Sequence, residues 1–317
     1  MFGYFFKRVA YAVPVCIAVS ALCFSLVYLA PGDPLSAVLP ADASQEIIDD
    51  IKAQYGLDKP VPVQYILWLG RAVTGDLGTS IGSGRSVALE IGNAIGNSLM
   101  LALFASIIGF TVGSFLGMIA GYYSGSTTDK VVSAIAISGV SIPHYWLGIV
   151  LVAIFSVELN WLPAMGAGAG GSQEWAWDWE HVRFIILPAI TLAAIPTGIV
   201  TRSVRALVAD TLSKEFVTAL IAKGLTNRAI FFHVVKNSAP TALSVIGVQL
   251  GYLMAGSILV ETVFSWPGTG LLLNTAIFQR DIPLLQGTIL VLALFFVGLN
   301  LLVDILQPLL DPRISRT

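Results

Sequence analysis

Six long stretches of apolar residues most strongly limit what this chain can fold into. Each has about 20 residues or more, the length of α-helix that crosses a hydrocarbon core of roughly 30 Å. We therefore predict an all-α membrane protein with six transmembrane helices. The predicted spans are Val9–Ala30, Ser98–Tyr122, Val131–Val157, Phe184–Ser203, Leu243–Val263 and Leu285–Leu306.

The balance of residue types agrees with a place in the lipid membrane. Hydrophobic residues make up 56% of the chain and charged residues 11%, whereas roughly a quarter of the residues in soluble domains are charged. A soluble protein this apolar would aggregate. The net charge of −2 argues against nucleic acid as a partner. Cys16 and Cys23 are too few ligands for a metal centre, so we predict neither a metal site nor a disulfide.

The charges predict how the chain is oriented. Lys7 and Arg8 precede the first apolar run, which is longer than the roughly 7–15 apolar residues of a signal peptide, so we predict an uncleaved helix. With both termini in the cytoplasm, eleven of the 17 lysine and arginine residues fall on the inner side. That distribution follows the positive-inside rule.

A polar region separates the first span from the other five. It contains a predicted short helix at Ser44–Tyr55 and a predicted interfacial helix at Val63–Val73, which carries aromatic residues suited to the headgroup level. We expect this region to be an external loop subdomain. The predicted organisation is an N-terminal segment and first helix at 1–30, the loop subdomain at 31–96, a five-helix core at 97–310 and a cytoplasmic tail at 311–317.

A charged, helix-prone loop at 210–240 joins the fourth and fifth spans. Ser213 is expected to cap a helix whose first turn carries Glu215, and Gly224 is expected to end that helix in a left-handed conformation. A second short helix is predicted at Asn227–Lys236. We expect the loop to lie on the cytoplasmic face, and the alternative is an interfacial helix resting on lipid headgroups.

Two features within the predicted spans indicate packing between helices more than a path for solute. Glycines recur every four residues in the second span, which predicts close helix packing, with a pore lining as the alternative. In the third span, Pro143 is expected to bend the helix. His144 beside it either meets solute at the bend or bonds a freed carbonyl or a neighbouring helix, and we favour the second interpretation. The four glycines are Gly109, Gly113, Gly117 and Gly121.

No motif for catalysis is present in the sequence. The glycine-rich phosphate loop with its lysine is missing, as are the GxSxG and HExxH patterns, so we predict no catalytic residues and no enzyme. A gradient-driven carrier, the alternative class, usually places an ionisable residue near the middle of the membrane. His144 is the single candidate for that role. The polar residues that we place along a translocation path are Asn97, Ser98, His144, Gln249, Tyr252 and Ser257.

The loop at 210–240 resembles the cytoplasmic loop of permease subunits of binding-protein-dependent ABC importers. The resemblance rests on Glu215, Gly224, His233 and their neighbours, although peptide-type members usually have Ala and Arg where this chain has Leu220 and Ile221. In that family the loop forms a coupling helix seated in a groove of the ATPase subunit. The resemblance implies ATPase-coupling roles for Glu215, Phe216, Ala219, Ala222, Lys223, Gly224, Ile230, His233 and Asn237.

Three further motifs resemble the first permease subunit of dipeptide and oligopeptide importers: PGDP at 31–34, YGLDKPVPVQYILWL at 55–69 and GDLGTS at 75–80. The resemblance implies the type I ABC importer fold and a bacterial inner membrane. It implies a heterodimer with a second permease subunit, two ATPase subunits and a periplasmic solute-binding protein. ATP and magnesium would bind to the ATPase subunits and not to this chain. Importers of nickel, glutathione or another small solute remain alternatives within the subfamily.

Overall fold

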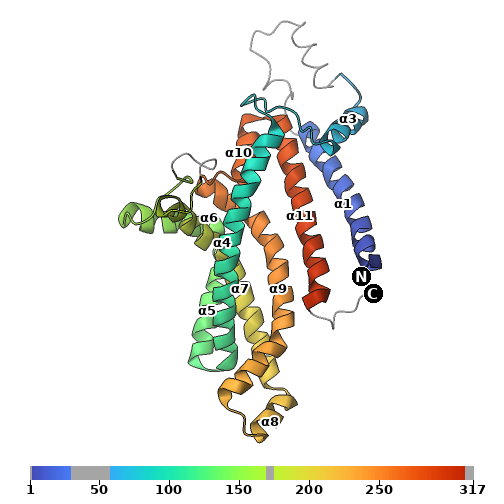
Figure 1. Ribbon diagram of the computed structural model, residues 1–317. Coiled ribbons are helices and arrows are strands. Elements are labelled where there is room, and N and C mark those ends of the chain that lie inside the picture. Colours follow the sequence, from blue (N-terminus) through green and yellow to red (C-terminus); the bar gives the residue numbers. More distant parts are fainter. Residues whose placement is uncertain (1, 30–57, 169–174, 311–317) are drawn as a thin grey trace. The chain divides into compact units, whose positions relative to one another are not determined.

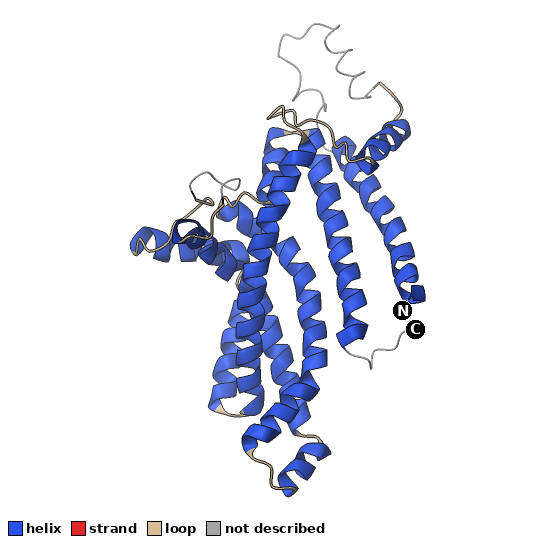
Figure 2. Cartoon of the chain, viewed as in Figure 1, coloured by secondary structure: helices blue, strands red, loops and turns tan. Residues whose placement is uncertain are grey.

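The computed structural model describes residues 2–29, 58–168 and 175–310. Within these ranges every extended regular element is a helix (Figures 1 and 2), apart from one isolated bridge between Thr79 and Ser86. The helices are α1 (Phe2–Leu29), α3 (Val61–Val73), α4 (Val87–Tyr122), α5 (Thr127–Ser141), α6 (His144–Leu151), the π-helical η2 (Val152–Glu158), α7 (Trp179–Leu212), α8 (Glu215–Ala222), α9 (Asn227–Val263), α10 (Thr269–Gln279) and α11 (Ile282–Leu310).

Helices occupy all six places where the sequence predicts a span. Among the described residues, α4, α7, α9 and α11 are long and apolar enough to cross a membrane, and α5 with α6 and η2 would make a fifth span. Helix α1 lies at the first predicted span and contains a shorter apolar stretch, Val13–Ser25. The all-α membrane fold is therefore confirmed.

The polar segments agree with the predictions in part. The predicted helix at Val63–Val73 is present as α3, whereas the predicted helix at Ser44–Tyr55 lies outside the described residues. The prediction of a separate helix at Asn227–Lys236 is wrong, because α9 continues from Asn227 to Val263 with Pro240 inside it. A proline removes a single backbone donor, and the rest of this long helix keeps its own hydrogen bonds.

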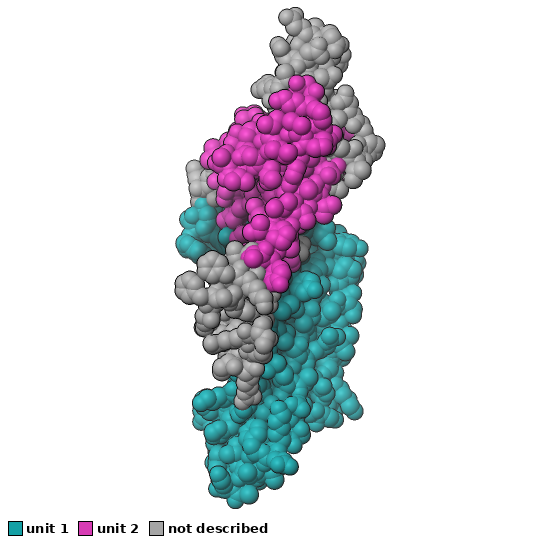
Figure 3. Space-filling view, turned by 90° about the vertical axis from the view of Figure 1, so that its right-hand side faces the viewer, with its two compact units in different colours: residues 1, 97–267, 299–317 teal, residues 2–96, 268–298 magenta. Residues whose placement is uncertain are grey.

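The chain divides into two compact units (Figure 3). The first consists mainly of Asn97–Pro267 and Leu299–Thr317, and the second of Phe2–Gly96 with Gly268–Gly298. The core of the second unit includes Val87, Ile91, Ala276 and Leu284. The first unit has two apolar cores, one of which surrounds the fully buried Leu101, Leu192 and Trp266.

The glycine stripe of α4 packs against α7 within the first unit. A Cβ atom added to Gly109 would lie 3.4 Å from the carbonyl oxygen of Ala193, and one added to Gly117 would lie 2.7 Å from that of Thr201. Gly121 approaches the backbone of Arg205 equally closely. The two backbones can meet this closely only because these positions lack side chains. The predicted packing role is confirmed.

The third predicted span is sharply bent at Pro143. Helices α5 and α6 meet at 102°, with Ile142 and Pro143 extended between them. Proline disfavours a helical conformation at the residue before it, and this places the break at Ile142. Helix α6 contacts α7 and α9, and Gly148 of α6 lies against Phe264.

Trp175, Trp177 and Trp179, around the start of α7, have different surroundings. Trp175 packs edge-on against Trp266, with ring centroids 5.6 Å apart, while Trp177 and Trp179 are largely exposed. Next to them, Asp178 caps α7, because it accepts hydrogen bonds from the ring Nδ1 and the backbone N–H of His181. These bonds lower the pKa of Asp178, so its carboxylate is ionised at neutral pH.

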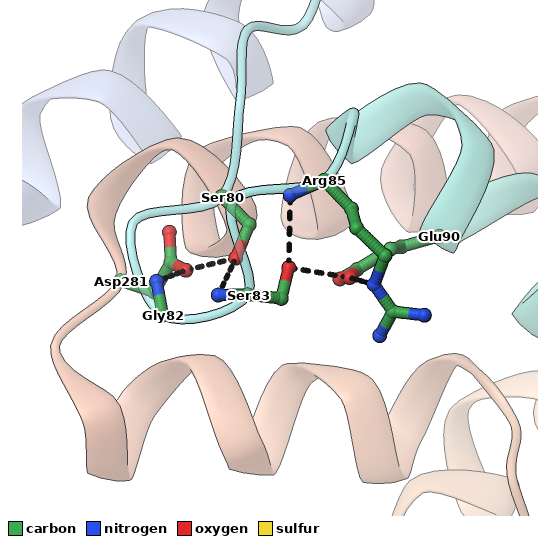
Figure 4. A network of polar contacts seen from close by, with 6 residues as sticks. All are labelled: Ser80, Gly82, Ser83, Arg85, Glu90 and Asp281. Carbon is green, nitrogen blue, oxygen red and sulfur yellow. Dashed lines mark hydrogen bonds and ion pairs between the residues drawn. The ribbon is translucent and has the colours of Figure 1, made fainter.

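A polar network in the second unit fastens the segment after Gly75 to the start of α11 (Figure 4). Asp281 is fully buried, and its carboxylate accepts hydrogen bonds from the Ser80 hydroxyl at 2.5 Å and from the Gly82 N–H at 2.9 Å. Its other oxygen accepts from the N–H of Leu284 and so caps α11. One carboxylate therefore satisfies three donors.

Replacing Asp281 with alanine is expected to destabilise the folded chain strongly. The change leaves buried donors without an acceptor, at about 1–3 kcal/mol each. Thermal unfolding of the purified chain in detergent measures the effect. Arg85→Gln is the matched control, because its ion pair with Glu90 lies at the edge of the same network with the arginine side chain 70% exposed. Such a pair contributes about 0–1 kcal/mol. Equal decreases in the unfolding temperature of the two variants would contradict a central role for Asp281.

Candidate functional site

Helix α8 and the ends of α7 and α9 form the corner that the sequence predicts as the coupling site. Ser213 does not cap α8, contrary to the prediction. It lies in a helical conformation at the C-terminus of α7, where its hydroxyl donates to the carbonyl of Asp210 at 2.8 Å. Lys214 is extended and precedes α8 without a side-chain cap. An N-cap residue needs an extended backbone, and the chain extends one residue later than predicted.

Gly224 ends α8 in the left-handed conformation that the sequence predicts, with φ at +74°. The Gly224 N–H donates to the Ile221 carbonyl at 2.9 Å, and the Leu225 N–H donates to the Leu220 carbonyl at 3.2 Å. These two bonds form a Schellman motif, which satisfies carbonyls that would otherwise lack partners. Thr226 then caps α9. The turn between the helices is thus closely specified.

An apolar core holds α8 in place. We call it the α8 core, and it joins α7, α8 and α9 within the first unit. Phe216 and Leu220 pack against it from α8. Its buried members are Val200, Val204, Val208, Val217, Ile230 and Val234. Because Val217 is only 4% exposed, a displacement of α8 must carry the attached ends of α7 and α9 with it.

Most of the predicted coupling residues lie on the exposed side of this corner. Phe216 is half-buried, and Ile230 is buried in the α8 core, so these two support the corner from within. The Asn237 amide donates to the carbonyl of His233 on its own helix. The exposed members are Glu215, Ala219, Ala222, Lys223, Gly224, His233 and Asn237.

Two exposed apolar side chains at the corner were not among the predicted coupling residues. Ile221 is 60% exposed and Phe232 is 67% exposed. Helical spacing alone would place Ile221 beside the apolar residues Phe216 and Leu220, but the structure leaves its side chain exposed. A large apolar side chain on the polar end of a membrane protein is a suitable contact for a protein partner. Their positions in the sequence could have indicated both residues. Ile221 lies three residues before Gly224, and Phe232 directly precedes His233.

The residues predicted for a translocation path are placed on α4, α6 and α9. Three are buried and bonded. The Asn97 amide donates to the carbonyl of Pro267 at 2.8 Å, and Ser98 and Ser257 are fully buried, each with an interaction partner. Tyr252 is 65% exposed on α9. Asn97 also accepts a hydrogen bond through its carbonyl from the indole of Trp266, so it serves as a link between segments of the first unit.

Two further path residues have polar atoms without partners in the described part of the chain. Gln249 is 5% exposed, and its Oε1 accepts no hydrogen bond. His144 is half-buried at the bend between α5 and α6, and its Nδ1 has no partner. A Cβ on Gly256 would lie 3.4 Å from the His144 ring, so this side chain faces α9. The structure brings His144 beside Gly256.

The described residues contain no group of His, Cys, Asp and Glu side chains that could hold a metal ion. An ion pair with a buried carboxylate joins Asp129 of α5 to Arg205 of α7, the helix that leads to α8. The corner thus presents exposed side chains on a rigid apolar base. Its geometry is suited to transmitting a mechanical displacement.

Comparison with known proteins relates nearly the whole chain to transport proteins. Residues 113–316 match the family described as binding-protein-dependent transport system inner membrane component, and residues 1–102 match the N-terminal region of such membrane components. The chain is 35% identical to the dipeptide transport system permease protein DppB of Alkalihalophilus pseudofirmus, with 99% of this chain and 100% of the relative covered. It is also 35% identical to the glutathione transport system permease protein GsiC of Escherichia coli K12, with 99% of each covered. The chain therefore belongs to the family of inner membrane components of binding-protein-dependent transport systems.

Proposed function

We propose that this chain is the first permease subunit of an ATP-driven importer for dipeptides or oligopeptides. Family membership supports a permease role, and the name of the relative DppB supports the class of solute. The α8 corner is the observation that carries the coupling mechanism. It combines an exposed apolar side chain, Ile221, with a base held rigidly by the α8 core.

The proposed assembly contains a second permease subunit, two ATPase subunits and a periplasmic solute-binding protein. Both termini of this chain lie in the cytoplasm, as the charge distribution predicts. ATP and magnesium bind to the ATPase subunits. When these subunits close on ATP, they displace α8, and the α8 core carries the ends of α7 and α9 along. The helices then change between inward-facing and outward-facing arrangements.

The sequence favours a bond from His144 to a freed carbonyl or a neighbouring helix, but its Nδ1 has no partner among the described residues, so we propose that His144 and Gln249 meet the solute. Each has a polar atom that the described residues leave without a hydrogen-bond partner. Peptide amide and carboxylate groups could supply the missing partner for a short time. Weak binding of this kind suits passage, because a solute that is bound too tightly is not released.

Glutathione is the second candidate solute, because the name of the relative GsiC refers to it. Uptake by the assembly purified from its own membranes separates the candidates. The assembly is placed in vesicles with ATP inside and the solute-binding protein outside. Radiolabelled dialanine, glutathione and Ni²⁺ are then offered in turn. We expect ATP-dependent uptake of dialanine. Uptake of glutathione or nickel alone would contradict the proposed solute but not the proposed ATP-driven mechanism.

The same vesicles distinguish a gradient-driven carrier from an ATP-driven permease. Vesicles that contain this chain without ATPase subunits serve as the matched preparation. We expect no flux there with or without a proton or sodium gradient. Gradient-dependent flux by the chain alone would refute the proposed function.

A further inference from the structure

An ion pair between a buried carboxylate and a partly exposed guanidinium connects α5 to α7 in the first unit. Asp129 is 3% exposed, and both of its oxygens accept from the guanidinium of Arg205, which donates through Nε and Nη2. Asp129 also accepts from the Gly125 N–H at 2.8 Å and from the Ser133 hydroxyl at 3.2 Å. The carboxylate therefore holds the turn before α5, where Ser126 is the N-cap, and links α5 to α7.

Arg205 is tied to the α8 core through its own helix. Val204 and Val208, which flank it on α7, are both buried members of that core. Farther along α7, the hydroxyl of Thr211 lies 3.0 Å from that of Ser238 on α9, and both residues are buried. The part of α7 that carries Arg205 is therefore continuous with the base of α8.

Asp129 is tied to the bend at Pro143 through α5. Helix α5 packs along α7, because Gly198 of α7 lies directly against the backbone of Ala136. Helix α5 then ends at Ser141, and the chain turns by 102° into α6, whose first residue is His144. A displacement that reaches Asp129 thus continues through one helix to the predicted solute path.

We propose that Asp129 and Arg205 are positioning residues that couple α8 to the α5–α6 bend. The guanidinium and the carboxylate meet through two parallel hydrogen bonds, a geometry that resists both sliding and rotation. The pair thus adds a directional polar link to the close packing of α5 on α7 at Gly198. The pair makes α5 follow α7 when the ATPase subunits displace α8. The inference rests on the proposed function, because the pair has this role only if ATPase subunits displace α8. The pair then gives that displacement a route to the solute path.

The inference is tested by the ratio of solute taken up to ATP hydrolysed. The complete assembly is studied in vesicles with Asp129→Asn, with Arg205→Met and with both changes together. The probe is radiolabelled dialanine, or glutathione if that is the solute that the wild type transports. For each single variant we expect the ratio to fall about tenfold, within the usual range of coupling between sites. Basal ATP hydrolysis per complex should stay near the wild-type rate.

The double variant separates positioning from stability alone. Arg205→Met leaves the buried carboxylate of Asp129 without its charged partner, whereas Asp129→Asn leaves unpaired a guanidinium whose side chain is 35% exposed. Changing both residues removes the unpaired buried charge, which carries the larger penalty. We expect the double variant to recover the wild-type yield of folded complex and to keep the low ratio. If the pair acted only in folding, the ratio would return to the wild-type value with the yield.

Asp210→Asn provides the matched control. Asp210 lies on α7 near α8 and pairs with Lys214 at 3.0 Å, but both side chains are more than half exposed. The change removes the same charge, and we expect the wild-type ratio. A wild-type ratio in the Asp129→Asn assembly would overturn the inference, as would an equal loss in Asp210→Asn. If the wild-type assembly transports without ATP, the proposed function itself fails, and the inference falls with it.

Discussion

Replacing Gly224 with valine is expected to reduce ATP-driven uptake at least about tenfold while the chain still inserts into the membrane. Gly224 has φ at +74°, a conformation that costs an ordinary L-residue roughly 1–2 kcal/mol and a β-branched residue more. With valine at position 224, the backbone there would therefore leave the left-handed region, and the two hydrogen bonds that end α8 would break. The helix would then present Ile221 in a different direction.

The surroundings of Gly224 explain why folding should survive this change. A Cβ at this position meets no other atom of the chain within 4 Å. The added side chain therefore projects from the corner and leaves the α8 core intact. Uptake by vesicles and the amount of ATPase that copurifies with the chain measure the two consequences separately.

Gly224→Asn is the matched control for this experiment. Asparagine adds a side chain of similar size to valine but adopts the left-handed conformation far more readily. We expect Gly224→Asn to retain most of the uptake. Wild-type uptake by the valine variant would contradict the coupling role of the corner. Equal loss in both variants would show that bulk at the corner matters more than backbone conformation.

Replacing Gly117 with alanine is expected to prevent most of the chain from folding stably. The new methyl group would lie 2.7 Å from the carbonyl oxygen of Thr201 and 2.7 Å from the Cβ of Val204. Neither atom is at the end of a flexible side chain, so α4 and α7 must move apart. Overpacking of this kind costs about 1–3 kcal/mol. Packing is then lost along the whole contact between α4 and α7, because the glycine stripe continues on both sides of Gly117.

The same helix supplies a graded set of controls. A Cβ on Gly109 meets its nearest atom at 3.4 Å, one on Gly113 at 2.9 Å, and one on Gly96 meets nothing within 4 Å. Alanine at Gly96 should be neutral or stabilise by up to about 1 kcal/mol, because glycine is a poor helix former. Thermal unfolding in detergent should therefore show that the unfolding temperature falls in the order Gly96→Ala, Gly109→Ala, Gly113→Ala, Gly117→Ala. Equal stability for the first and last of these would contradict close packing of α4 on α7.

The spans could be predicted from the sequence because lipid requires them to be long and apolar. The left-handed end of α8 could also be predicted, because only glycine adopts such a conformation without strain. The cap of α8 was misplaced by one residue, since either Ser213 or Lys214 could have been the point where the chain extends. The continuity of α9 through Pro240 was missed, because the loss of one hydrogen bond in a long helix is tolerated.

Contacts between distant residues could not be predicted. The glycine stripe indicates a packed face, but only the structure shows that α7 is its partner. Asp129 and Arg205 are separated by 76 positions, and nothing in the pattern around either residue indicates the other. The exposure of Ile221 depends on how α8 packs on α7 and α9, and helical periodicity alone places it beside the apolar face.

Photo-crosslinking from position 221 tests the central claim most directly. A photoreactive amino acid replaces Ile221 in the complete assembly within native membranes, and irradiation follows. We expect a covalent adduct between residue 221 and an ATPase subunit. A control chain with the same photoreactive residue and the additional Asp210→Asn change should form as much of this adduct. Adducts with lipid alone, or with the solute-binding protein on the opposite side of the membrane, would contradict it.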